Sequence, residues 1–80
     1  MYHLYILECA DGSLYTGITT DVDRRVAEHN SSALGASYTR GRRPVTLLGM
    51  KTFADRSSAS KEEYRIKQLS KEEKRAWILK

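Results

Sequence analysis

Short runs of aromatic and branched residues occur near the start of the chain. Residues 2–9 (YHLYILEC) and 13–19 (SLYTGIT) have the composition of β-strands, and a turn-forming Asp-Gly pair lies between them. We therefore expect an antiparallel hairpin. A third strand is predicted at residues 44–53 (PVTLLGMKTF), with Pro44 at its first position because proline cannot donate a hydrogen bond inside a sheet.

The length of the hairpin loop decides which side chains share a face of the sheet. A two-residue loop places Tyr5 and Tyr15 on opposite faces. A three-residue loop, with Gly12 in the left-handed conformation, pairs Tyr5 with Gly17 and places both tyrosines on one face. In that register the missing side chain of Gly17 leaves a pocket beside the Tyr5 ring. The strand pattern alone leaves both registers open.

Helical spacing and capping residues predict three helices. They cover residues 20–30, 58–69 and 70–80. Thr20 or Asp21 is expected to cap the first helix, and Ser70 forms a capping box with Glu73 at the start of the third. The predicted order is β-β-α-β-α-α in a single domain, residues 1–80. This is an α+β fold with a small three-stranded antiparallel sheet flanked by helices.

The first predicted helix carries two cationic side chains on its apolar face. Arg25 and His29 lie one turn apart on the stripe that also contains Val22 and Val26. One interpretation is a pair of functional groups held at the edge of the core. The other is an arginine that buries its stem and a histidine that is bonded to a backbone carbonyl.

The second predicted helix has two adjacent acids near its apolar stripe. Helical spacing puts Glu62 closer to the centre of the stripe than Glu63. Ser60 and Glu63 also match a capping box, which is a purely structural role. Spacing alone therefore does not decide which acid has a chemical function.

The composition narrows the class of protein. A chain of 80 residues that is 40% hydrophobic and 30% charged is an ordinary globular chain, and no apolar run approaches the length of a membrane span. The first residues do not match a secretory signal, and the single cysteine, Cys9, excludes an internal disulfide. We expect a cytoplasmic protein in which Cys9 is a small, semi-buried hydrophobic residue.

The net charge of +4 is unevenly distributed along the chain. Arg40, Arg42 and Arg43 fall within four positions of a long loop, residues 31–43, that also contains Tyr38. Long loops in small domains are often functional, and a concentrated basic loop is a candidate phosphate contact. A solvated run of charges is the equally weighted alternative.

Five ordered blocks, LYIL, YTGIT, DRRVAEHN, YTRGRRPV and EYRIKQLS, span nearly the whole chain. In this order they resemble the GIY-YIG endonuclease superfamily, and above all its small single-domain bacterial members. By this resemblance, Tyr5 and Tyr15 are the two tyrosines that give the family its name, and Gly17 is the glycine of the second triplet. Arg25 and His29 correspond to the family's arginine and histidine on the first helix, and Glu63 to its metal-binding acid. The chain departs from the family pattern at His3, where the first glycine is missing, and in residues 70–80, which contain no asparagine.

The resemblance implies an endonuclease that depends on Mg²⁺ or Mn²⁺ and hydrolyses phosphodiester bonds of DNA, in the setting of repair or recombination. Tyr5 would deprotonate the attacking water, Tyr15 and His29 would orient it, Arg25 would stabilise phosphoryl charge, and Glu63 would hold the metal. Nucleic-acid contacts are expected from the following residues: Gly17, Tyr38, Arg40, Arg42, Arg43 and Lys67. Phosphate contacts of this kind predict structure-directed or nonspecific binding.

Two other functions fit the same residues. A nucleic-acid-binding module would keep the fold and the basic loop without cleavage, and the missing asparagine favours it. A protein-interaction domain with no nucleic-acid role is the third. We expect a monomer that has no membrane partner and that a protein partner could direct to its substrate.

Overall fold

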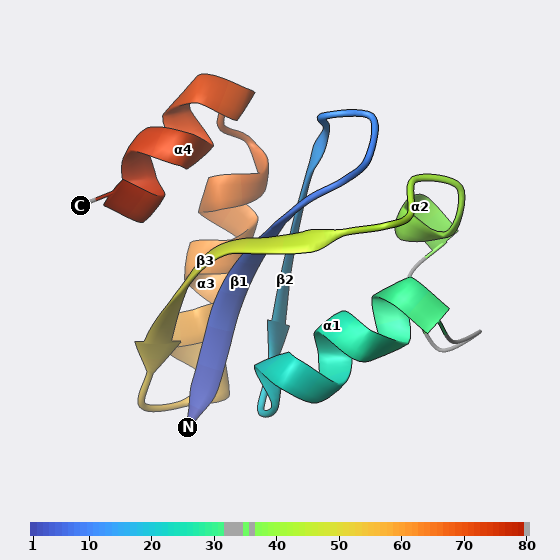
Figure 1. Ribbon diagram of the computed structural model, residues 1–80. Helices are drawn as coiled ribbons and strands as arrows, with labels where there is room; N and C mark the ends of the chain where they lie inside the picture. Colours follow the sequence, from blue (N-terminus) through green and yellow to red (C-terminus); the bar gives the residue numbers. More distant parts are fainter. Residues whose placement is uncertain (32–34, 36, 80) are drawn as a thin grey trace.

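The computed structural model describes residues 1–31, 35 and 37–79. Its three strands, β1 (Tyr2–Glu8), β2 (Leu14–Thr19) and β3 (Thr46–Phe53), form an antiparallel sheet in the order β2-β1-β3 (Figure 1). The described helices are α1 (Val22–Ser31), α2 (Ser37–Arg40), α3 (Arg56–Lys67) and α4 (Lys71–Leu79). This confirms the predicted α+β fold. The short helix α2 is an addition, because it lies within the stretch predicted as a loop.

The hairpin between β1 and β2 has the three-residue loop. Gly12 adopts a φ of 85°, and the amide of Cys9 donates to the carbonyl of Ser13. Tyr5 is therefore opposite Gly17, and Leu7 is opposite Tyr15. A positive φ is a conformation that glycine adopts without steric cost. The register that places both tyrosines on one face is confirmed.

Strand β1 is the centre of the sheet, and it is buried on both faces. Leu4 and Ile6 pack on one face against Ile66 of α3 and Trp77 of α4. The other face carries a second cluster, which α1 covers through Val26. Its buried members are Tyr5, Leu7, Cys9 and Val45. Cys9 is 4% exposed, so the predicted semi-buried hydrophobic residue is fully part of the core. The sheet thus lies between α1 and α2 on one side and α3 and α4 on the other (Figure 1).

The helix starts follow from side chains that accept exposed backbone N–H groups. Asp21 accepts from Arg24 at 3.1 Å, so Asp21 and not Thr20 caps α1. The capping box at α4 is confirmed, since Ser70 and Glu73 each accept from the backbone amide of the other. None of the helices in the described part of the chain is long and apolar enough to cross a membrane.

Helix α3 begins earlier than residue 58, where the sequence pattern placed its start. Asp55 has an extended backbone and accepts from the amide of Ser58 at 2.8 Å, so the helix begins at Arg56. Ser60 therefore lies in the second turn, and its predicted capping box with Glu63 is wrong. This correction leaves the carboxylate of Glu63 without a capping role.

One buried hydroxyl in the sheet has no partner. Thr16 of β2 is 2% exposed, and its Oγ1 lacks a hydrogen-bond partner among the described residues. An unsatisfied buried hydroxyl costs about 1–3 kcal/mol. We expect Thr16→Val to raise the free energy of unfolding by about 1 kcal/mol, or the melting temperature by about 4–8 °C. Thermal denaturation followed by circular dichroism measures this, and a lower melting temperature would show that the hydroxyl has a partner in solution.

Candidate active site

A chain of three buried side chains lies on the α1 face of the sheet. The Tyr5 hydroxyl is 3.0 Å from His29 Nε2, and His29 Nδ1 is 2.9 Å from Thr39 Oγ1. His29 and Thr39 are 0% exposed, and Tyr5 is 2% exposed. These residues come from β1, α1 and α2, so three separate elements hold the imidazole in place. Both ring nitrogens of His29 have side-chain partners, which excludes the predicted alternative of a histidine held by a backbone carbonyl alone.

The Tyr5 ring occupies the space above Gly17. A Cβ atom at position 17 would lie 2.5 Å from the Tyr5 hydroxyl oxygen and 2.7 Å from Cζ. Such distances are shorter than real Cβ contacts, so only glycine admits the ring at this place. The space that the sequence pattern assigned to a pocket is therefore filled by Tyr5 itself, whose hydroxyl is brought toward α1.

Two further tyrosines extend this cluster toward the surface. The Tyr15 ring centroid lies 5.1 Å from that of His29, edge-on, and 6.5 Å from that of Tyr5. On its outer side, Tyr15 is 5.7 Å from Tyr38, which is 39% exposed. The guanidinium carbon of Arg42 lies 4.0 Å from the centre of the Tyr38 ring. Tyr38 therefore packs between Tyr15 and Arg42 and anchors the loop to the sheet.

Arg25 and Glu63 influence the Tyr5 phenol from two different helices. Burial, followed by the charge of Tyr15, raises the pKa of Tyr5 to about 12, and Glu63 contributes in the same direction. A side-chain hydrogen bond from Arg25 and its positive charge act against this shift without cancelling it. Tyr5 is thus a neutral phenol at neutral pH, and its proton must move before it can act as a base.

His29 is held as a neutral imidazole. Burial, and then the positive charge of Arg25, lower its pKa below the ordinary value of 6.5. Near pH 6, His29 therefore binds a proton in the unfolded chain but not in the folded chain. The folded state consequently loses stability as the pH falls below about 6.5. We expect the melting temperature of the wild type to decrease more between pH 8 and pH 5 than that of His29→Asn. Parallel pH profiles for the two proteins would contradict a neutral His29.

The two adjacent acids of α3 have different surroundings. Glu62 accepts two hydrogen bonds from Arg65, at 2.8 and 2.7 Å, and one from Trp77 Nε1 at 3.1 Å. Glu63 has a different partner, since Lys67 Nζ is 3.4 Å from its Oε2, and its charge is the smallest of the contributions that raise the pKa of Tyr5. The carboxylate of Glu62 therefore holds α3 to α4, whereas that of Glu63 is near enough for its charge to act on Tyr5.

The basic loop is partly used inside the protein. Arg42 Nε donates to Asp11 Oδ2 at 3.1 Å, and Arg42 Nη1 donates to the Tyr38 carbonyl at 2.7 Å. Arg43 Nε donates to the carbonyl of His29. Arg42 and Arg43 thus have structural partners inside the protein, and Arg40 is exposed at the end of α2 and also has a partner.

Two residues of this region had no signal in the sequence. Thr39 is the partner of His29 Nδ1, although it lies in a stretch without helical or strand periodicity. The Asn30 side chain donates to the carbonyl of Val45 at 3.0 Å and accepts from its amide at 2.7 Å. This pair of hydrogen bonds fixes the end of α1 to the segment before β3, and it thereby positions His29 one residue earlier.

Comparison with known proteins links this geometry to a family. The family model described as "GIY-YIG catalytic domain" matches residues 1–76. A UPF0213 protein of Desulfotalea psychrophila is 61% identical over 77 residues, which are 96% of this chain and 70% of that protein. A UPF0213 protein of Halobacterium salinarum is 59% identical over 76 residues, which are 95% of this chain and 97% of that protein.

Two structures solved by NMR in solution have the same fold. The UPF0213 protein from Bacillus halodurans superposes with a TM-score of 0.60 at 48% identity, covering 98% of this chain and 83% of that one. A protein from E. faecalis superposes with a TM-score of 0.66 at 40% identity, covering 96% of this chain and 81% of that one.

Proposed function

Because the chain belongs to the GIY-YIG family, which is a family of nuclease domains, we propose that it is a metal-dependent endonuclease acting on DNA. The observation that carries this proposal is the buried pair of Tyr5 and His29, 3.0 Å apart, with Arg25 and Glu63 close enough to shift the phenol's pKa. A structural pair would not need a permanent cation and an acid beside it. Hydrolysis of a phosphodiester needs a base, a cation and a metal ligand.

The residues present fit a single Mg²⁺ ion. Among the described residues, no three His, Cys, Asp or Glu side chains gather as a metal cluster. Mg²⁺ does not require one, because it keeps several waters and is bound through one or two carboxylates together with substrate phosphates. Glu63, with a side chain 22% exposed beside the tyrosine cluster, would hold the ion. When bound, Mg²⁺ or Mn²⁺ supplies positive charge that neutralises the phosphate oxygens.

The chain's own side chains would perform the proton transfer. An imidazole whose Nδ1–H donates to Thr39 presents the lone pair of Nε2 to the Tyr5 hydroxyl. Tyr5 would take a proton from the attacking water while it passes its own proton to His29, because a pKa of about 12 disfavours a free phenolate beforehand. Arg25 would stabilise the negative charge that develops on the Tyr5 oxygen and on the phosphoryl group.

Binding without cleavage is a second candidate function, and the pKa of Tyr5 favours it. A phenol with a pKa of about 12 is a poor base at neutral pH. In that case the tyrosine cluster would be a rigid support for the basic loop, since Tyr38 and Arg42 pack on it.

A cleavage assay tests the proposal. Labelled single-stranded, duplex, flapped and branched DNA and matched RNA are incubated with the protein in Mg²⁺ or in EDTA. We expect cleavage of DNA that requires Mg²⁺ and decreases at least about 100-fold in Arg25→Ala, because Arg25 is placed to stabilise charge in the transition state. Cleavage that Arg25→Ala leaves unchanged would point to a contaminating nuclease. Binding without cleavage on every substrate would support the second function.

A further inference from the structure

Three lysines gather where α3 meets α4. Lys67 is near the end of α3, and Lys71 and Lys74 are one turn apart on α4, a spacing that puts them on the same helix face. Lys67 lies 3.4 Å from Glu63, whereas Lys71 and Lys74 have no acidic group within 4.0 Å among the described residues. We refer to these three side chains as the lysine cluster.

Charge pairing accounts for Lys67, which is paired with Glu63, and, among the described residues, not for Lys71 or Lys74. Burial, and then the positive charge of Lys67, lower the pKa of Lys74. Like charges one turn apart on a helix are unfavourable by a few tenths of a kcal/mol. Packing alone therefore does not account for three cations at this junction, and a polyanion bound at the surface would relieve their repulsion.

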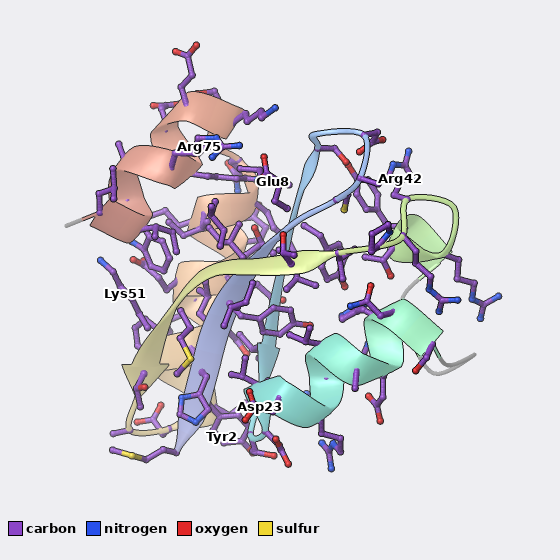
Figure 2. All side chains as sticks on the ribbon, viewed as in Figure 1. Tyr2, Glu8, Asp23, Arg42, Lys51 and Arg75 are labelled. Carbon is purple, nitrogen blue, oxygen red and sulfur yellow. The ribbon has the colours of Figure 1, made fainter. Side chains whose placement is uncertain are left out.

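The lysine cluster and the arginine loop, which is the part of the basic loop that carries Arg40, Arg42 and Arg43, lie on two sides of the β1–β2 hairpin. Asp11 at the hairpin tip pairs with Arg42, and a Cβ atom at the next residue, Gly12, would lie 3.4 Å from Lys71 Nζ. The ion pair between Arg75 and Glu8 fixes α4 beside the hairpin (Figure 2). In Figure 1 the hairpin tip projects between α4 and α2. Cations thus flank the hairpin tip on both sides, and the charged residue of the tip itself, Asp11, is paired with Arg42.

We infer that the lysine cluster is a second phosphate-binding surface, which holds the DNA backbone on the α4 side of Glu63 while the arginine loop holds it on the α2 side. This inference rests on the proposed function, because it assigns the same DNA to both surfaces. Contacts from Lys71 and Lys74 to phosphates are independent of base sequence and sensitive to salt. With Lys67 beside Glu63, the cluster would direct one strand past the carboxylate.

The experiment measures DNA binding in EDTA, so that cleavage plays no part. Fluorescence anisotropy of a labelled 20-nucleotide single strand gives the dissociation constant of the full chain at several salt concentrations. The variant is Lys71→Gln/Lys74→Gln, which leaves Lys67 beside Glu63 untouched. The matched control is Arg56→Gln/Lys61→Gln, which removes two positive charges from exposed positions in the first half of α3. Circular dichroism shows that each variant is folded.

We expect the Lys71→Gln/Lys74→Gln variant to bind about 10-fold more weakly, with a salt slope reduced by about 1.4, which corresponds to two lost phosphate contacts. The control should stay within about twofold of the wild type. Equal effects of the two variants, or no DNA binding by the wild type, would overturn the inference. Polyglutamate that displaces the strand as well as unlabelled DNA does would also overturn it. Binding with this pattern but without cleavage in Mg²⁺ would uphold it and reject the proposed nuclease activity.

Discussion

Gly17→Ala is expected to decrease the proposed nuclease activity about 100-fold and to lower the free energy of unfolding by about 1–3 kcal/mol. The added methyl group would lie 2.5 Å from the Tyr5 hydroxyl oxygen, so the ring has to move. Forcing extra volume into a packed core costs energy of this order. A shift of about 1 Å in a reacting group is enough for a 100-fold loss of rate. Cleavage rates and thermal denaturation measure the two effects.

Gly41→Ala is the matched control for this substitution. A Cβ atom at Gly41 would have no heavy atom within 4 Å, so the same chemical change should leave activity and stability close to those of the wild type. If Gly17→Ala were as active and as stable as Gly41→Ala, the Tyr5 ring would not be confined by β2. Such a result would contradict the proposal that cleavage depends on the position of the Tyr5 ring.

The hairpin shows how far the sequence predicts this fold. Its strands follow from composition, but two loop lengths fit the same residues, and they place Tyr15 on opposite faces. The three-residue loop is stabilised by local bonds, since Asp11 Oδ1 accepts from the amide and the hydroxyl of Ser13 and Gly12 adopts its positive φ. The hydrophobic pattern contains no information about such local hydrogen bonds. It therefore does not decide between the two registers.

The site was less predictable, because its decisive contacts join residues far apart in the chain. His29 was singled out by helical spacing, but its partners Tyr5 and Thr39 lie 24 and 10 residues away. The sequence of the basic loop fits two interpretations: its arginines contact phosphate, or they form a solvated run of charges. In the structure Arg42 also covers Tyr38 and Arg43 also binds the end of α1, since a loop of this length needs internal anchors.

Glu62 and Glu63 are a second case in which a contact between distant residues decides the role of a side chain. Periodicity placed Glu62 nearer the buried stripe, and the resemblance to the family favoured Glu63. A long-range contact distinguishes the two acids. Trp77, which lies 15 residues further along the chain, donates a hydrogen bond to Glu62. With Glu62 engaged by Trp77 and Arg65, Glu63 is the acid whose charge acts on Tyr5. The two neighbours therefore provide a variant and its control in one turn of helix.

Glu63→Gln is expected to decrease the proposed Mg²⁺-dependent cleavage at least about 1000-fold, equivalent to about 4 kcal/mol of transition-state stabilisation. The amide keeps the size of the side chain and removes the charge that we propose to hold the metal. Its melting temperature should change little, since the partner Lys67 is half-exposed and a partly exposed ion pair contributes little to stability. Glu62→Gln should do the opposite: it loses about 0.5–1 kcal/mol of stability with its Arg65 pair and retains cleavage. Cleavage rates and thermal denaturation are measured for both variants. Loss of cleavage in Glu62→Gln alone would indicate Glu62 as the metal ligand in place of Glu63.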